Sequence, residues 1–434
     1  MYPNSHRRLA TRALVAALLV AACDAPVTNP LPVTPPLQGI QASEGVANNA
    51  RMVALGDRIF SDVNLSIGGN QSCESCHDAA FGFTAPDENV NAHGSVMPGS
   101  IAGRFGNRRP PTASYAAFSP VLAYHDEDGV WIGGNFLDGR ATGQRLGSPT
   151  AEQALGPFVN RDEMALPDPA CVVYRIAEGK YAPLYRAAWG NSIFQIAFPA
   201  RAAMTSLCAT EGTVVPLSPG DRQQVLTEYD RIGFSLAAFE KSPLVSPFSS
   251  RFDEARSGGA KLTTEEMEGL ELFVGKANCA ACHPVAGKKP LLTDFTFDNI
   301  GVPANPENPA LLANGFVDLG LGGFLNDPSL NGAIKVPTLR NLAKKPTPFS
   351  SKSYTHNGVF KTIEQVVHFY NTRDVLPTCP SGVGPYDPRF GTTCWPGPEM
   401  PDNVNREELG RLGLSPLEEA RLVLFLRTLS DRIN

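Results

Sequence analysis

The stretches Cys73-Glu74-Ser75-Cys76-His77 and Cys279-Ala280-Ala281-Cys282-His283 are two copies of one pattern, Cys-x-x-Cys-His. In a helical turn, two cysteines three residues apart and the histidine after them lie on one face. The cysteines can then form thioethers to a porphyrin whose iron the histidine binds, and this spacing is the signature of c-type haem attachment. The alternative is a zinc or thiol-redox Cys-x-x-Cys, but structural zinc needs four clustered ligands. The sequence therefore predicts two haem c groups.

The two motifs also share their upstream context, which indicates a duplicated domain. Leu55-Gly56-Asp57-Arg58-Ile59-Phe60 precedes the first motif, and Gly269-Leu270-Glu271-Leu272-Phe273 precedes the second. The pattern breaks near residues 242–258, which are rich in serine, proline and glycine. We therefore predict an N-terminal haem domain over residues 44–245 and a C-terminal haem domain over residues 255–434.

Helix-start signals are clear, whereas strand signals are weak and scattered. Thr263 with Glu266 and Thr362 with Gln365 have the spacing of capping boxes. Ser415 with Glu418, followed by Pro416, predicts a last helix that runs to about Leu429. The chain has 40 glycines and 38 prolines, which favours short helices joined by long connections. We predict a mainly α fold of two cytochrome c-like domains, packed with the haems facing their interface.

The N-terminus has the composition of a targeting segment. Basic residues between positions 6 and 12 precede the apolar run Ala13–Val20, which is too short to span a bilayer. Small residues then precede Cys23, so residues 1–23 resemble a lipoprotein signal with Cys23 as the lipidated residue. The alternative is an ordinary export signal that includes a cysteine. Residues 24–43 are proline-rich and predict an extended tether.

The remaining cysteines predict two disulfide bonds. The chain has nine cysteines, of which four belong to the haem motifs and one is Cys23. An even remainder of four in an exported protein suggests two bridges. Proximity in the sequence favours Cys171–Cys208 and Cys379–Cys394, although three pairings can be drawn and free buried thiols are the alternative.

The net charge of −6 and the lack of a basic block exclude a nucleic-acid partner. Outside the N-terminal signal, no segment is long and apolar enough to cross a membrane, so a lipid anchor would be the only membrane contact.

From about residue 50 onward the chain resembles the bacterial di-haem cytochrome c peroxidase and MauG family. Its markers, in order around the two haem motifs, are Phe136-Leu137-Asp138-Gly139-Arg140, Gln153 with Gly156-Pro157-Phe158-Val159-Asn160, Glu163-Met164-Ala165, Lys335-Val336-Pro337-Thr338-Leu339-Arg340-Asn341 and His356-Asn357-Gly358. The resemblance implies an enzyme that acts on hydrogen peroxide.

In this family the N-terminal haem is the peroxide site, with His77 as the expected proximal iron ligand. Glu163 matches the distal carboxylate that acts as acid and base, and Gln153 and Pro157 would shape the distal pocket. Without the resemblance, Glu163 would be interpreted as a solvent-exposed charge on the protein surface. The resemblance also makes His93 a displaceable ligand that blocks the first iron in the resting state, whereas a histidine in a glycine-rich loop is ordinarily exposed and idle.

At the C-terminal haem the resemblance makes His283 the proximal ligand. Typical peroxidases of the family place methionine opposite this histidine, but the matching residue here is Tyr370, as in MauG. A phenolate oxygen stabilises ferric iron and lowers the reduction potential. Tyr370 also completes an apolar helical stripe, so a core position is the alternative. Met400 is a weaker competitor as the ligand.

Two departures from the family pattern limit what the resemblance implies. The family usually has tryptophan between the haems where this chain has Leu137, which cannot be oxidised; Trp131 is the nearest substitute. Family members often bind calcium between the domains, but the aligned residue here is Arg109, with Asn107 as an alternative ligand. Calcium is therefore an open expectation.

The sequence leads to a di-haem oxidoreductase that reduces hydrogen peroxide with electrons from a cytochrome, a cupredoxin or another redox protein. One alternative is MauG-like oxidation of a side chain of a partner protein. Another is a non-enzymatic electron carrier. We expect export to the periplasm or cell envelope with a lipid anchor, and a homodimer is one of the assemblies left open.

Overall fold

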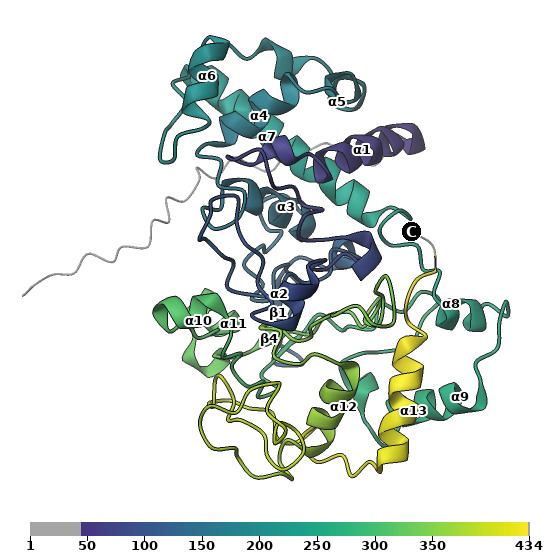
Figure 1. Cartoon of the computed structure of the whole chain (residues 1–434). Helices are drawn as coiled ribbons and strands as arrows, with labels where there is room; N and C mark the ends of the chain where they lie inside the picture. The colour runs from purple at the N-terminus through teal and green to yellow at the C-terminus, as the bar shows by residue number, and fades with distance from the viewer. Residues whose placement is uncertain (1–44, 433–434) are drawn as a thin grey trace, which may run out of the picture. The chain divides into compact units, whose positions relative to one another are not determined.

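The computed structural model describes residues 45–432, and their secondary structure is dominated by helices (Figure 1). The predicted mainly α fold is confirmed. The helices are α1 (Gly45–Phe60), α2 (Glu88–Ala92), α3 (Pro149–Val159), α4 (Pro169–Ala177), α5 (Ala182–Trp189), α6 (Arg201–Leu207), α7 (Pro219–Lys241), α8 (Arg251–Arg256), α9 (Thr264–Val274), α10 (Pro309–Asn314), α11 (Gly320–Leu325), α12 (Ile363–Thr372) and α13 (Pro416–Arg427).

The strands are short and form two antiparallel pairs. β1 (Ala123–His125) pairs with β2 (Val130–Ile132), and β3 (Phe297–Asp298) pairs with β4 (Ile334–Lys335). Most of the remaining chain is loop, as the glycine and proline content predicts.

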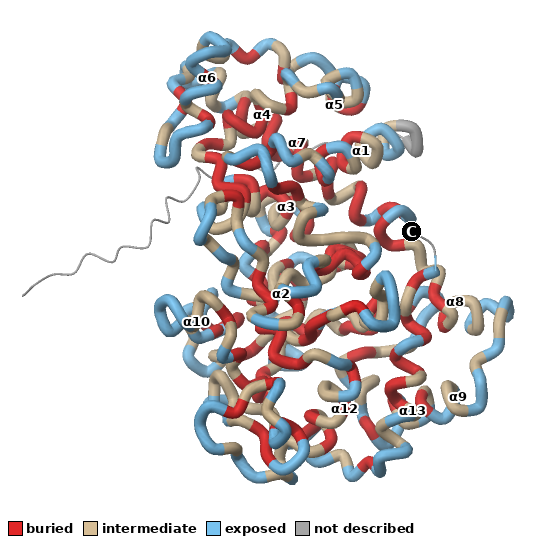
Figure 2. The backbone as a smooth tube through the Cα atoms, in the orientation of Figure 1, coloured by how far each residue is buried: buried red, intermediate tan, exposed pale blue. Residues whose placement is uncertain are grey.

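The buried apolar residues form two clusters. The N-terminal core draws its members from Leu55 to Val245, and the C-terminal core draws its members from Phe252 to Leu429. In Figure 1, α1, α4, α5, α6 and α7 gather in one group, while α9, α12 and α13 lie together in another. Figure 2 shows buried segments inside both groups and exposed segments on the outer loops. The proposed domain limits stay a prediction: the N-terminal core lies within 44–245, whereas the C-terminal core already includes Phe252, which precedes the predicted start at residue 255.

The helix starts follow the capping signals with one difference. Thr263 and Ser415 each open a helix with a complete capping box, and the last helix ends at Arg427 rather than near Leu429. Thr362 accepts a hydrogen bond from the backbone N–H of Gln365. The Gln365 side chain accepts from the N–H of Lys361 instead of from Thr362 itself, at 2.7 Å. In a complete capping box the Gln365 side chain would accept from the N–H of Thr362, so this second bond is shifted by one residue.

The longest helix, α7, is not expected from the sequence. Its 23 residues bury Val225, Ile232 and Leu236 at helical spacing against α1, α3 and α4. The same helix also buries Glu228, whose carboxylate pairs with Arg231 at 2.9 Å. Buried charges of this kind dilute the apolar period, and helical periodicity is the signal from which a helix is predicted.

The same helix crossing occurs once in each core. Gly56 of α1 packs against the backbone carbonyl of Ser235 in α7, and Gly269 of α9 packs against the carbonyl of Arg421 in α13. Four residues after each glycine, Phe60 and Phe273 contact another phenylalanine, with ring centroids 5.2 Å and 5.1 Å apart. A side chain on either glycine would collide with backbone, so glycine is required for the close approach. The duplication seen in the sequence thus corresponds to a repeated packing arrangement.

We expect Gly56→Ala to destabilise the protein by about 1–3 kcal/mol, because the new methyl group has to displace the Ser235 carbonyl. Alanine has the higher helix propensity, so the loss would come from packing alone. Gly220→Ala is the matched control, since a methyl group there meets nothing closer than the Ser218 hydroxyl at 3.9 Å. Thermal unfolding of the haem-loaded proteins measures both. Equal melting temperatures for Gly56→Ala and wild type would contradict the crossing.

The four cysteines other than Cys23 and those of the haem motifs lie in two pairs, as their sequence proximity suggests. Cys171 and Cys208 have Cα atoms 5.5 Å apart, and Cys379 and Cys394 have Cα atoms 4.9 Å apart. Both distances fall in the range of bridged cysteines. The first pair joins the buried helix α4 to the residue after α6, within the N-terminal core.

The predicted signal at residues 1–23, the lipidated Cys23 and most of the tether at 24–43 lie outside the described residues. Within residues 45–432, no helix is long and apolar enough to cross a bilayer.

Candidate functional site

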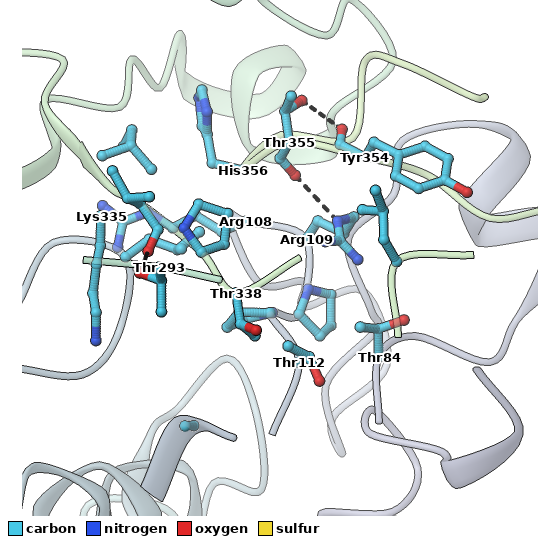
Figure 3. Close-up of a pocket in the computed structure, with 18 of the residues that line it drawn as sticks. Thr84, Arg108, Arg109, Thr112, Thr293, Lys335, Thr338, Tyr354, Thr355 and His356 are labelled. Atoms are coloured by element: carbon cyan, nitrogen blue, oxygen red, sulfur yellow. Dashed lines mark hydrogen bonds between the residues drawn. The ribbon is translucent and has the colours of Figure 1, made fainter. Parts of the chain in front are cut away.

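One cavity takes its walls from both cores and from both Cys-x-x-Cys-His motifs. The motif residues that line it are Cys73, Cys76, His77, Cys279, Cys282 and His283. Its volume is about 440 Å³, which lies within the roughly 300–1,000 Å³ of ordinary small-molecule sites. Figure 3 shows part of its wall, where Arg108 and Arg109 lie close to Thr338 and Thr355. The cavity therefore brings the residues of both motifs to one space.

Both motifs fold as tight turns. The Cys73 carbonyl accepts hydrogen bonds from the N–H groups of Cys76 and His77, at 3.0 Å and 2.9 Å. The Cys279 carbonyl accepts in the same way from the N–H of His283, at 2.9 Å. These bonds hold the thiols and the imidazole of each motif on one side of its turn. All four motif cysteines line the cavity, and none of them forms a disulfide bond.

Each motif histidine is oriented by a backbone carbonyl. His77 Nδ1 lies 3.1 Å from the Phe83 carbonyl, and His283 Nδ1 lies 2.8 Å from the Leu292 carbonyl. Phe83 and Leu292 adopt left-handed backbone conformations, with φ of 58° and 56°. Such conformations are costly for bulky residues and concentrate at functional sites. Nδ1 is occupied in both cases, so Nε2 is the nitrogen available to a metal.

The charge states of these groups fit haem attachment. Burial lowers the pKa of His77 and of His283, which favours the neutral imidazole that binds iron. Burial also raises the pKa of Cys76 and of Cys279 to about 12, so the thiols stay neutral within the cavity. Among the described residues, no cluster of three or more His, Cys, Asp or Glu side chains could hold a metal, which leaves the zinc alternative without a site. The donor sets therefore fit two haem c groups.

Glu163 lines the same cavity, close to the first motif. Its backbone N–H donates to the Asn160 carbonyl at 3.1 Å, and its own carbonyl accepts from the Ser100 N–H at 2.7 Å. Burial raises the pKa of the Glu163 carboxyl, and the charge of Arg140 partly opposes this. The charge of Glu163 in turn raises the pKa of Cys76, which is evidence of their proximity. The carboxyl therefore holds a proton at higher pH than an exposed glutamate would.

Arg140 is held in place beside the cavity by two contacts. Its Nη1 donates to the Asp138 carboxylate at 2.5 Å, and its guanidinium lies 3.6 Å from the centre of the Phe136 ring. Asp138 also accepts from Arg108 at 2.7 Å. These contacts keep a fixed positive charge within reach of Glu163.

Gln153 and Pro157 line the cavity from helix α3. They stand four residues apart, so they project from the same face of the helix. The Ser148 side chain caps this helix by accepting from the N–H of Ala151 at 3.2 Å. The Pro157 carbonyl accepts from the N–H of Met164, the residue after Glu163, at 3.2 Å, and the roles of Gln153 and Pro157 in a distal pocket stay a prediction.

Tyr370 lies in the cavity on the side of the second motif. It is carried by α12 and packs against the C-terminal core, as Cys279 also does. Burial raises the pKa of the phenol and the charge of Arg373 opposes this, so the phenol stays protonated unless a stronger cation such as ferric iron is bound beside it. Met400 lines the cavity as well, so both of the proposed sulfur or oxygen ligands are present in it.

His93 is not brought to this cavity. Its side chain is 57% exposed, and Nδ1 lies 3.4 Å from the Glu307 carboxylate. The ring also approaches Tyr386, with centroids 6.4 Å apart. In this arrangement His93 cannot face the first motif, because the turn after α2 directs it outward. A role as a displaceable iron ligand requires this loop to move, and it stays a prediction.

The residues proposed to couple the two haem sites occupy different places. Leu137 lines the cavity, and its carbonyl accepts from the Lys335 N–H at 2.8 Å. Trp131 lies instead in the hairpin of β1 and β2, where its ring packs against Tyr124 with centroids 5.5 Å apart. Trp131 is not among the described residues that line the cavity, so it is poorly placed to substitute for the family's tryptophan.

At the position expected for calcium, the chain has a fixed cation of its own. The Arg109 side chain donates to the Thr355 carbonyl at 3.1 Å. The Asn107 carbonyl accepts from the Asn308 side chain at 3.0 Å. Arg109 places positive charge where a calcium ligand was expected, so nothing here supports the calcium expectation.

Sequence reasoning missed one buried acid in the cavity wall. Glu240, near the end of α7, is 4% exposed, and its Oε2 atom has no hydrogen-bond partner. Its charge is one of the causes that raise the pKa of Cys73. A charged residue near the end of a long helix reads as solvent-exposed, so only the packing of α7 under the first motif identifies it.

Glu240 makes stability depend on pH. Burial raises its pKa to about 8, so between pH 5 and 8 the folded protein holds a proton that the unfolded chain has lost. Stability should then fall as pH rises through this window, by on the order of 3 kcal/mol. We expect Glu240→Gln to remove this fall, whereas Glu271→Gln on the exposed face of α9 should keep it. Melting temperatures at pH 5 and pH 8 measure the difference, and parallel curves for wild type and Glu240→Gln would contradict the assignment.

Comparisons with known proteins agree with this geometry. The sequence profile of the di-haem cytochrome c peroxidase family matches residues 50–261. The methylamine utilization protein MauG of Paracoccus denitrificans is 32% identical over 415 residues, which cover 93% of this chain and 94% of MauG. The cytochrome c551 peroxidase of Nitrosomonas europaea is 29% identical over 339 residues, or 76% of this chain and 75% of that protein.

A solved structure is also similar over most of the chain. The diheme peroxidase BthA of Burkholderia thailandensis superposes with a TM-score of 0.67 at 28% identity, and the match covers 88% of this chain and 86% of BthA. The sequence and structure comparisons thus both lead to di-haem peroxidases and MauG proteins. The chain belongs to the di-haem cytochrome c peroxidase and MauG family.

Proposed function

We propose that this protein is a peroxide-dependent oxidoreductase, with peroxide reacting beside the first motif and electrons entering beside the second. The observation that carries the proposal is the single cavity that both motifs line, with Glu163 next to the first of them. The overall reaction would be H₂O₂ + 2 e⁻ + 2 H⁺ → 2 H₂O. His77 and His283 would each hold one haem iron, and Cys73, Cys76, Cys279 and Cys282 would hold the porphyrins.

The haem iron, when bound, supplies the centre at which the peroxide O–O bond is reduced. The task of Glu163 is to take the proton from one peroxide oxygen and return it to the other. Its raised pKa suits this exchange, because a carboxyl that titrates closer to neutrality both accepts and gives up a proton readily. Arg140 limits the rise in this pKa, and Gln153 and Pro157 limit the space around the carboxyl.

Electrons would reach the cavity at the His283 side from a cytochrome or a cupredoxin. A second candidate function is MauG-like oxidation of a partner protein, and two observations favour it. Tyr370 lines the cavity at the second motif, and MauG is 32% identical over almost the whole chain. Leu137 weighs against it, since an aliphatic side chain cannot relay an oxidising equivalent between the two sites.

We also propose that the protein is exported to the periplasm or cell envelope and is anchored by lipid at Cys23. The Cys171–Cys208 and Cys379–Cys394 pairs support export, because disulfide bonds persist in oxidising compartments. Metabolic labelling with a radioactive fatty acid tests the anchor. Label that enters wild type but not Cys23→Ser supports it, and an unlabelled wild-type protein refutes it.

The function is tested by mixing the fully reduced and half-reduced holoprotein with H₂O₂ while an electron donor protein is present in excess. Oxidation of two equivalents of reduced cytochrome or cupredoxin per peroxide supports the peroxidase. Consumption of one equivalent of peroxide by the protein without prior reduction, and without donor oxidation, favours the MauG-like alternative, because the two electrons would then come from the oxidised protein itself. The absence of any reaction with peroxide in either state would leave an electron carrier.

A further inference from the structure

Arg109 stands in the cavity wall and ties the two cores together. Its backbone N–H donates to the His356 carbonyl at 2.7 Å, and its Nε donates to the Thr355 carbonyl at 3.1 Å. Figure 3 shows the guanidinium next to Thr355 and Tyr354, with the bond to Thr355 dashed. Arg109 is therefore fixed by backbone contacts on the C-terminal side of the cavity, and its guanidinium is part of the cavity lining.

The charge of Arg109 is not balanced by an acid. Its Nη1 atom is buried and has no hydrogen-bond partner. Burial lowers the Arg109 pKa to about 10, and the opposing influence comes from the Tyr354 phenol rather than from a carboxylate. The preceding residue is the contrast, since Arg108 forms ion pairs with Asp318 at 2.5 Å and with Asp138 at 2.7 Å. A buried, unpaired charge is costly unless an anion joins it.

A second buried cation stands close to Arg109. Lys352 is 5% exposed, and its Nζ donates to the carbonyls of Phe81, Asn341 and Lys344 at 2.8–2.9 Å. These bonds use all three donors of the ammonium. Lys352 therefore has no donor left for a ligand, whereas the Nη1 group of Arg109 has no partner. Burial lowers the pKa of Lys352, and the nearby charge of Arg109 lowers it further.

The positive charge of Arg109 lies on the side of the first motif. Three residues further along the chain, the Thr112 side chain donates to the Gly82 carbonyl at 2.7 Å. Gly82 directly precedes Phe83, whose carbonyl orients His77. An anion that pairs with Arg109 would therefore belong to the group held at His77.

We propose that Arg109 is the counter-ion of a carboxylate side chain of the haem held by Cys73, Cys76 and His77. A haem carries two carboxylate side chains, and a guanidinium matches a carboxylate in both charge and geometry. Because Arg109 is tied to Thr355 and His356, it links the first haem to the loop of the C-terminal core. The proposal rests on haem attachment and not on the proposed reaction with peroxide.

The test compares Arg109→Gln and Arg109→Lys with wild type by spectroelectrochemical titration of the holoproteins at pH 8, where carboxylates are ionised. Loss of a positive charge stabilises the ferric form. We expect Arg109→Gln to lower the reduction equilibrium constant of the first haem about tenfold, which is about 59 mV for one electron. The second haem is the internal reference and should shift less than about twofold. Arg109→Lys keeps the charge and should stay within about threefold of wild type.

Arg104→Gln is the matched control, because Arg104 pairs with Glu211 at the surface. It should leave both potentials unchanged. The proposal is overturned if Arg109→Gln keeps the wild-type potential of the first haem, or if both haems shift equally. Should Arg109→Gln fail to mature, Arg109→Lys decides: a wild-type potential supports the counter-ion, and a tenfold fall overturns it. These titrations do not involve peroxide turnover. A result that overturns the role of Arg109 would therefore not count against the proposed function.

Discussion

Replacing Glu163 with glutamine should lower kcat/KM for hydrogen peroxide about a thousandfold. Glutamine keeps the shape of the side chain but can neither take up nor release a proton. The backbone bonds of Glu163 to Asn160 and Ser100 do not involve its side chain, so the fold should persist. Stopped-flow measurement of peroxide consumption by the haem-loaded, half-reduced protein gives the rate, and unchanged spectra of both haems before mixing verify that the sites are intact.

The pH profile separates an acid–base role from a structural one. Burial raises the Glu163 pKa above its usual range, so the wild-type rate should fall on the acid side at a higher pH than an exposed glutamate would allow. Glu163→Gln should lose this limb of the profile. Asp162→Asn is the matched control, because Asp162 is the neighbouring acid, with its side chain 46% exposed beside Arg161. A full rate in Glu163→Gln with a slow Asp162→Asn would transfer the role to Asp162.

Replacing Tyr370 with phenylalanine should raise the reduction potential of the second haem by about 100 mV or more, within the roughly 0.8 V range that axial ligands control. A phenolate oxygen stabilises ferric iron, and phenylalanine offers no ligand atom in its place. The remaining ring keeps the apolar contacts of α12 in the C-terminal core. Spectroelectrochemistry gives the potential, and the visible spectrum of the ferric protein reports the change of ligand directly.

Two further variants identify the ligand. Tyr354→Phe alters another tyrosine of the same cavity and should leave the second haem unchanged. Met400→Leu tests the competing ligand, since Met400 also lines the cavity. If Met400→Leu changes the spectrum of the second haem while Tyr370→Phe does not, Met400 holds that position and the MauG-like alternative loses its main support.

The sequence predicts those parts of the fold that depend on residues close together in the chain. The two haem motifs, the caps at Thr263 and Ser415 and the mainly α class all follow from short patterns, because a helical turn or a cap involves residues only three or four apart. The pattern of a glycine four residues before a phenylalanine, at Gly56 and Gly269, is also visible in the sequence. The crossing that these glycines permit becomes visible only in the structure, where the partner helices come from distant parts of the chain.

Side chains whose role depends on distant partners could not be assigned in this way. Glu240 reads as a surface charge, and its burial follows from the packing of α7. Arg109 reads as one more basic residue next to Arg108, yet the structure pairs Arg108 with two acids and Arg109 with none. The family resemblance suggests His93 as an iron ligand, whereas the fold turns its side chain toward Glu307.

The sequence by itself determined the covalent chemistry of this protein, because Cys-x-x-Cys-His contains all the groups that attach one haem within a single turn, and the pattern occurs twice. Only the tertiary structure decided what surrounds those haems. It brings both motifs to one cavity, adds Glu163, Tyr370 and Arg109 to its wall, and leaves Trp131 outside. The physical reason is that burial and unpaired charge are properties of the packed cores, to which segments far apart in the chain contribute together.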